Sequence, residues 1–192
     1  MQTTLRRTAE ARSVSPLTGL PGNPRIEHEI AARAASGAPY AVCHVDLDEF
    51  KSFNDAYGFL RGDRLLLTLS SCLLASAAAA GEPRPFVGHV GGDDFVVVCT
   101  PAQAEPFGTR VVADFDGAVS AHYDPEDAAR GCLEVPDRRG ELRKHPLVSV
   151  SLGIAWHVGG DRDHRAVVAA AAEMKRWAKR QPGAVVAVDR RG

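Results

Sequence analysis

The chain has 192 residues, of which 45% are apolar, and this length and composition suit one domain of ordinary size. A formal net charge of −1 argues against a nucleic-acid-binding protein with a broad basic face, whereas a small phosphate ligand needs only one or two cations. No apolar stretch follows the charged N-terminus and no run reaches the ~18 apolar residues of a membrane span, so we expect a cytoplasmic protein without a signal peptide or membrane contact.

Helical and strand patterns alternate along the chain. Residues 1–14 are polar and lack a core pattern, which predicts a tail or the end of a signalling helix, and the Pro- and Gly-rich stretch 15–25 predicts a structured loop. Periodicity then predicts, in order, a helix (25–36), a strand (40–47), a short helix with a turn (48–59), a helix (62–80), two strands (85–90 and 95–100) and a helix (104–123).

A polar, turn-rich insert occupies about residues 123–146 and is expected to form a protruding β-hairpin around Arg138–Gly140, either as a surface excursion or as a contact for a partner domain. A strand (147–158), a helix (164–180) and a final strand (184–189) follow. This order of elements predicts an α/β (α+β) fold with one mixed central sheet flanked by helices.

The stretch HVGGDDFVVV (89–98) places two carboxylates, Asp93 and Asp94, between two apolar strands. A third carboxylate, Asp46, ends the predicted strand 40–47. If these strands are neighbours, Asp46 and Asp93 meet at one end of the sheet, where a proton or a cation must relieve their repulsion. Mg²⁺ typically takes one or two carboxylates together with substrate phosphates, which is the arrangement of metal-assisted phosphoryl transfer. The same residues also fit an ordinary hairpin turn that exposes both aspartates to water.

The glycines before these aspartates also allow two interpretations. Gly91 and Gly92 lack side chains and permit unusual φ angles, so a nucleotide could approach the backbone closely there. A tight turn between the two strands explains the pair equally well.

Five segments, SPLTGLPGN, DLDEFKSFNDAYGFLRGD, GGDDF, VSLGIA and EMKRWAKRQPG, occur in an order that resembles the GGDEF family of bacterial diguanylate cyclases. The resemblance covers nearly the whole chain and implies a domain over 15–192 with a palm-like, nucleotide-cyclase-like fold. It implies condensation of two GTP molecules into cyclic di-GMP and pyrophosphate, with Mg²⁺ (or Mn²⁺) as cofactor and a homodimer as the active form. It also implies a sensor or phosphodiesterase domain as a partner, in cis or in trans.

The resemblance assigns roles to individual residues. Asp46 and Asp93 would hold the metal ions with the carbonyl of Leu47, and Asp94 would stand at the family's essential Glu, as a third catalytic carboxylate. Residues that would contact GTP are Asn54 and Asp63 at the guanine edge, Lys51, Lys179 and the backbone at Phe50 at the phosphates, and Gly91 and Gly92 beneath the nucleotide. Taken one by one, the two lysines could instead be solvated helix residues, and Asn54 and Asp63 could be caps or turn residues.

The chain departs from the family pattern at its catalytic positions. Asp94 is one methylene shorter than Glu, which reduces its reach by over ~1 Å. Ser15 stands where the opening motif usually has Asp, and His89 stands where many members have Arg. An Arg that often follows the final Lys motif is absent, and Arg176 or Arg180 could substitute for it.

The family's product-inhibition site also lacks its residues. An Arg-x-x-Asp motif would fall at Glu82 and Pro85, so product feedback through that site is not expected.

Two other functions remain compatible with these residues. Because Asp94 is short and an Arg is missing, the domain could be a regulatory module that binds GTP and turns it over weakly or not at all. The palm domains of CRISPR polymerases also carry a GGDD sequence and form a different product, but Asp63 favours guanine over adenine.

Overall fold

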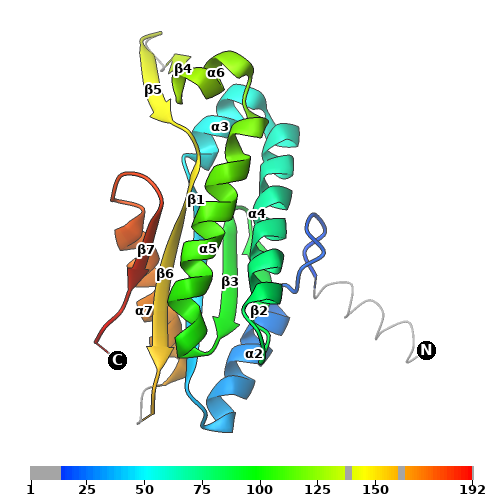
Figure 1. The fold of residues 1–192 in the computed structure, drawn as a ribbon, viewed down its shortest axis with the longest axis vertical. Coiled ribbons are helices and arrows are strands. Elements are labelled where there is room, and N and C mark those ends of the chain that lie inside the picture. The colour runs from blue at the N-terminus through cyan, green and yellow to red at the C-terminus, as the bar shows by residue number, and fades with distance from the viewer. Residues whose placement is uncertain (1–13, 137–139, 160–162, 192) are drawn as a thin grey trace, which may run out of the picture.

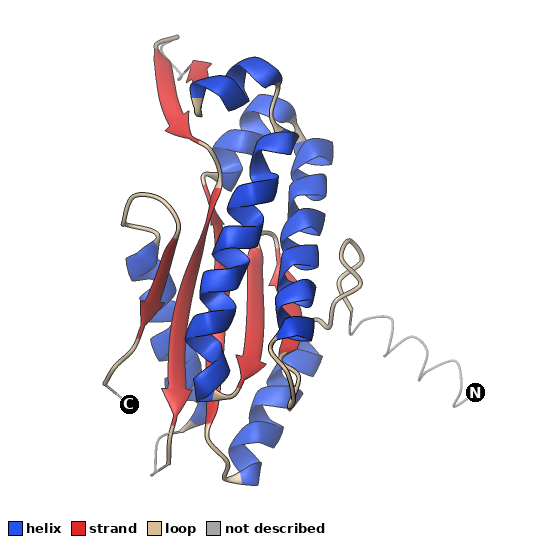
Figure 2. Cartoon of the chain, in the orientation of Figure 1, coloured by secondary structure: helices blue, strands red, loops and turns tan. Residues whose placement is uncertain are grey.

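The computed structural model describes residues 14–136, 140–159 and 163–191. Its centre is a five-stranded sheet in the order β2-β3-β1-β6-β7 (Figures 1 and 2). The strands are β1 (Tyr40–Asp48), β2 (Phe86–Gly91), β3 (Asp94–Cys99), β6 (Ser149–His157) and β7 (Val185–Val188). Neighbouring strands run antiparallel except β6 and β7, which are parallel. The predicted mixed sheet flanked by helices is therefore confirmed.

Helices cover both faces of this sheet. The helices are α2 (Asn23–Ser36), α3 (Phe50–Tyr57), α4 (Phe59–Ala79), α5 (Pro101–Val119), α6 (Pro125–Arg130) and α7 (His164–Ala178). One face packs against α4 and α5 through the larger apolar cluster, which includes Leu65, Leu69 and Phe115. The other face packs against α2 and α7 through a smaller cluster that includes Ile30 and Val167 (Figure 1).

Helices α4 and α5 each begin three residues earlier than their apolar periodicity predicts, and α2 begins two residues earlier. Helix α4 starts at Phe59, whose side chain is exposed and so lies outside the apolar pattern. Helix α5 starts at Pro101 because Thr100 and Gln103 form a capping box and Pro suits the first helical position.

Strand β1 lies between β3 and β6, and its register positions the acidic residues. Val45 pairs with Phe95 of β3, so Asp46 and the residues that precede Phe95 lie at the same end of the sheet. This is the neighbouring arrangement under which Asp46 and Asp93 were expected to meet.

Helix α7 approaches the sheet closely because Gly153 of β6 has no side chain. A Cβ atom on Gly153 would lie 2.0 Å from the backbone nitrogen of Lys175 and 2.2 Å from the carbonyl oxygen of Ala171. Gly153 also pairs with His44 of β1. The glycine of the VSLGIA segment therefore sets the position of α7 above β1.

The insert forms a two-stranded sheet from β4 (Cys132–Pro136) and β5 (Leu142–Pro146), as predicted, whereas Arg138 lies outside the described residues. The hairpin is anchored to α3, since His145 Nδ1 lies 2.9 Å from Glu49 Oε2 and 3.1 Å from Ser52 Oγ. At the α6 end, Tyr57 donates a hydrogen bond to Asp127.

Within the described residues, no helix combines the length and apolar character that a membrane span requires. Residues 1–13 of the predicted N-terminal tail lie outside the described residues, so the boundary at 14–15 stays a prediction.

Candidate active site at the GGDD turn

The turn between β2 and β3 presents the acidic residues. Gly91 pairs with Asp94, which leaves Gly92 and Asp93 as the two central residues of the hairpin loop. Gly92 has φ 59°, a left-handed value that a two-residue type II′ turn requires at its first central position and that glycine adopts without strain. The turn thus explains Gly92, and it leaves Asp93 half-buried at the end of the sheet.

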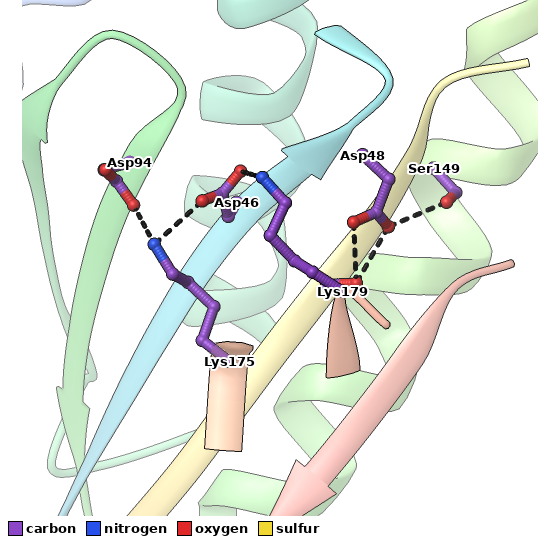
Figure 3. Close-up of polar contacts among 7 residues, drawn as sticks. Asp46, Asp48, Asp94, Ser149, Lys175 and Lys179 are labelled. Carbon is purple, nitrogen blue, oxygen red and sulfur yellow. Dashed lines mark hydrogen bonds and ion pairs between the residues drawn. The ribbon is translucent and has the colours of Figure 1, made fainter. Parts of the chain in front are cut away.

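Asp46 is the most buried carboxylate of the site, with a side chain only 6% exposed. Both of its oxygens accept hydrogen bonds from ammonium groups of α7 and the residue after it: Lys175 Nζ lies 2.8 Å from Oδ2 and Lys179 Nζ lies 2.5 Å from Oδ1 (Figure 3). Burial would raise the pKa of Asp46, but the hydrogen bonds and charges of the two lysines outweigh it and lower the pKa below its ordinary value.

The pKa of Asp93 is shifted in the opposite direction to that of Asp46. Burial, the negative charge of Asp46 and a hydrogen bond with Asp46 together raise the pKa of Asp93 to about 6. The charge of Asp46 therefore acts on Asp93, in keeping with the strand register that places both residues at the same end of the sheet. A shared proton is one way to relieve their repulsion, and a cation is the other.

Asp94 and Asp48 lie on either side of Asp46 but have different partners. Asp94 accepts a hydrogen bond from Lys175, so Lys175 bridges Asp46 and Asp94 (Figure 3). Asp48 accepts hydrogen bonds from Ser149 and Ser151 of β6, at 2.8–3.0 Å. Asp48 is therefore held by the hydroxyl groups of the neighbouring strand.

Lys175 was not predicted from the sequence, although a signal for it exists. It precedes Lys179 by four residues, and residues at this spacing lie on the same face of a helix. The side chain of Lys175 is only 14% exposed and that of Lys179 is 34% exposed, so both differ from the solvated lysines of an ordinary helix surface.

Asn54 and Asp63 come from two consecutive helices, α3 and α4. The side-chain oxygen of Asn54 is buried without a hydrogen-bond partner. A Cβ atom on Gly62 would lie 1.9 Å from this oxygen, so Gly62 is the residue that makes room for Asn54. Asp63 follows directly and is half-buried. A buried unpaired acceptor is costly, which makes Asn54 a candidate for a ligand contact.

Three other residues with predicted roles do not converge on Asp46. Lys51 is 88% exposed and pairs with Asp55 on the surface of α3, at 2.5 Å. Phe50 begins α3 and packs against the larger apolar cluster. Leu47 has a fully buried side chain, so only its backbone is available to a ligand.

His89 links the GGDD turn to the loop that precedes α2. Its Nε2 lies 2.9 Å from the carbonyl oxygen of Gly92, and its Nδ1 lies 2.8 Å from Ser15 Oγ and 3.0 Å from Thr18 Oγ1. Because a carbonyl can only accept, Nε2 carries the proton and Nδ1 accepts from the two hydroxyl groups. The ring is 5% exposed and stacks on Phe95, with 4.2 Å between ring centroids.

The residues around Asp46 suit a divalent cation whose coordination shell is completed by oxygens of a bound ligand. Among the described residues no group of three or more His, Cys, Asp or Glu side chains forms a ready-made metal site. Asp46 and Asp93 supply two carboxylates at the same end of the sheet, which is the number that Mg²⁺ often takes from a protein when phosphate oxygens supply the remainder.

Comparisons with known proteins identify the family of this chain. The family model described as diguanylate cyclase, GGDEF domain, matches residues 14–184. The chain is 32% identical over 124 residues to diguanylate cyclase DgcP of Pseudomonas aeruginosa, covering 61% of this chain and 18% of the relative. It is 36% identical over 150 residues to cyclic di-GMP phosphodiesterase PdeR of Escherichia coli, covering 76% and 19%. The chain thus spans about a fifth of each of these relatives.

Solved structures show the same fold. The coiled coil and GGDEF domain of DgcB from Caulobacter crescentus, solved in complex with c-di-GMP, superimposes with a TM-score of 0.71 at 21% identity, covering 98% of this chain and 91% of that one. A sensory box/GGDEF family protein from Caulobacter crescentus is 28% identical, with a TM-score of 0.59 and coverage of 88% and 98%. Because the family model matches residues 14–184, the chain belongs to the family of GGDEF domains found in diguanylate cyclases.

Proposed function

We propose that this domain condenses two molecules of GTP into cyclic di-GMP and releases pyrophosphate. The observation that carries the proposal is the placement of Asp46 and Asp93 at the same end of the sheet, with the ammonium group of Lys179 on Asp46. A carboxylate pair beside a cation, at an open glycine turn, is suited to a triphosphate with its metal ion. Membership of the GGDEF family supports the same reaction.

Asp46, Asp93 and the carbonyl of Leu47 would hold Mg²⁺ or Mn²⁺ in this site. The bound metal would supply charge neutralisation for the triphosphate. The raised pKa of Asp93 supports this role, because a cation between the two carboxylates would replace the proton that they otherwise share.

The reaction joins two nucleotides held on two copies of the domain. The 3′-oxygen of each GTP forms a bond to the α-phosphorus of the other, both α–β phosphoanhydride bonds break, and two pyrophosphates leave with the bonding electrons. Asp94 would accept the proton of the 3′-hydroxyl, and Lys179 would contact phosphate oxygens. Because each copy supplies one GTP, we expect turnover to require a homodimer and to depend on protein concentration.

Asn54 and Asp63 would select guanine. The buried Asn54 oxygen lacks a partner, and a carboxylate at Asp63 can accept from the N1 and N2 hydrogens of guanine. Leaving such groups unpaired is costly, so a site built this way rejects a base that lacks matching donors. Phe50, Lys51, Gly91 and Gly92 are proposed to lie along the triphosphate.

Signalling would come from another part of the same protein or from a separate one. The anchored β4–β5 hairpin and the loop before α2 are the described segments through which such a partner could act. The identity of the partner as a sensor or phosphodiesterase domain is part of this proposal.

Product analysis tests the proposed function. Purified protein at high concentration is incubated with GTP and Mg²⁺, and the products are separated by chromatography beside an Asp93→Ala control. We expect cyclic di-GMP from the wild type alone. If wild type and a forced dimer both bind GTP but form no cyclic di-GMP, the domain is a GTP-binding regulatory module and the proposal is wrong.

A further inference from the structure

The carboxylate cluster of Asp46, Asp93 and Asp94 already has its own cations. Lys175 Nζ contacts Asp46 and Asp94, and Lys179 Nζ contacts the second oxygen of Asp46 (Figure 3). When all three carboxylates are ionised, the two ammonium groups balance two of the three negative charges, and the neighbouring Asp48, whose charge also acts on Asp46 and Lys179, adds one more. The remaining negative charge is enough for one divalent ion and not for two.

The two lysines differ in how firmly they are held. Lys179 follows the last residue of α7 and its side chain is 34% exposed, so it can turn toward a bound phosphate. Lys175 lies inside α7, its side chain is 14% exposed, and its backbone rests against Gly153 of the central sheet. Lys175 therefore cannot leave the cluster without giving up two charge-assisted hydrogen bonds in a largely buried position.

The ammonium group of Lys175 lies where a cation would bridge Asp46 and Asp94. Its nitrogen lies between an oxygen of Asp46 and an oxygen of Asp94, two carboxylates that come from neighbouring strands. A cation in this place removes the repulsion that a second divalent ion would otherwise relieve. It also repels any divalent ion that binds at the adjacent Asp46 and Asp93.

We infer that Lys175 is a resident cation of this site, which takes the place of one metal ion and sets the affinity for the other. On this basis Asp94 serves in the resting site as the counter-ion of Lys175, and one divalent ion binds between Asp46 and Asp93. The inference deepens the proposed function, since it rests on the metal site named there, but it concerns metal binding and not turnover.

Titration with Mn²⁺ alone, followed by calorimetry, tests the inference. Removing a unit positive charge within a few ångströms of a divalent ion removes its repulsion, so we expect Lys175→Met to bind Mn²⁺ at least ~10-fold more tightly than the wild type. Lys144→Met is the matched control, because Lys144 is an exposed lysine paired with Glu134 on the β4–β5 hairpin. That variant should bind Mn²⁺ as the wild type does.

A gain of less than ~10-fold for Lys175→Met would overturn the inference. Should that variant not fold, as judged by circular dichroism, Lys175→Gln removes the charge while keeping a polar group of similar reach, and the same threshold applies. The outcome is separate from the product assay: a protein that makes no cyclic di-GMP but shows the gain in Mn²⁺ affinity retains the inference and loses the proposed function. A protein that makes cyclic di-GMP but shows no gain in Mn²⁺ affinity on Lys175→Met retains the proposed function and loses the inference.

Discussion

Ser15 and His89 are separated by 74 positions in the sequence, yet the Ser15 hydroxyl donates a 2.8 Å hydrogen bond to Nδ1 of His89. Both residues depart from the pattern of the GGDEF family, and the structure pairs them. The other ring nitrogen of His89 donates to the carbonyl of Gly92, directly before Asp93. The His89 side chain thus connects the loop before α2 to the turn that carries Asp93 and Asp94.

Replacing His89 tests this connection. His89→Phe keeps a ring on Phe95 but loses the hydrogen bond to Gly92, and a displacement of ~1 Å at a reacting group can lower the rate ~100-fold. We expect turnover to fall ~10–100-fold with little change in the Kd for GTP. His89→Gln, whose amide can donate to Gly92, should recover part of the rate. Equal turnover in wild type and His89→Phe would exclude a positioning role.

Loss of Asp63 should weaken GTP binding without unfolding the domain. A hydrogen bond to a charged group is worth ~1.5–3 kcal/mol, so Asp63→Ala should raise the Kd for GTP ~10–100-fold and reduce discrimination against ATP. Calorimetric titration measures both affinities. Asp114→Ala, at a partly exposed carboxylate of α5, is the control. An unchanged Kd for Asp63→Ala would remove this residue from guanine recognition.

Replacing Gly62 by alanine should displace the side chain of Asn54 and so weaken GTP binding. The new Cβ would lie 1.9 Å from the Asn54 oxygen, so Gly62→Ala must displace this side chain. Loss of one hydrogen bond of ~0.5–1.5 kcal/mol predicts a Kd for GTP that is ~2–10-fold higher. Gly117→Ala is a matched control, because a Cβ there meets no atom within 4 Å. If both variants bind GTP equally, Asn54 does not contact the nucleotide.

Lengthening Asp94 tests whether its reach limits the reaction. Asp94→Glu adds about one bond length, and if the shorter carboxylate is misplaced by over ~1 Å, turnover should rise by up to ~100-fold. Asp94→Asn, which removes the charge, should lower turnover. Steady-state rates of pyrophosphate release provide the comparison. A rate for Asp94→Glu at or below that of the wild type would show that Asp is already the better residue beside Lys175.

The raised pKa of Asp93 makes a prediction about stability and pH. Its pKa moves from an ordinary 3.8 to about 6, so between these values the native state binds more protons than the unfolded state. This contribution to stability is fully present below pH ~4 and is lost as pH rises through ~6. The Asp93→Asn variant has no such carboxyl group and does not undergo this loss. The difference between the Tm of the variant and the Tm of the metal-free wild type should therefore increase from pH 4.5 to 7.5.

Thermal unfolding in the presence of a chelator measures this difference. Asp114→Asn, at a partly exposed carboxylate, should keep a constant Tm difference from the wild type over the same range. A constant difference for Asp93→Asn as well would contradict the raised pKa of Asp93 and its interaction with Asp46.

The sequence alone determined most of the secondary structure and the family, but it did not predict α6 or the starts of α4 and α5. Apolar periodicity predicted the strands of the central sheet and the hairpin of the insert, since each strand and helix face must match the period of its own backbone. The order of the motifs identified Asp46, Asp93, Asn54 and Asp63 as candidates. Short-range patterns are sufficient for these conclusions because they depend on neighbours in the chain.

Only the tertiary structure decided which partners these residues have. Lys175 reaches Asp46 because Gly153, on another strand, lets α7 lie close to the sheet. His89 meets Ser15, and Asn54 fits only because Gly62 leaves space for it. These contacts join segments brought together by packing, and periodicity cannot specify the distance between two elements. The charge balance of the candidate site therefore follows from the fold.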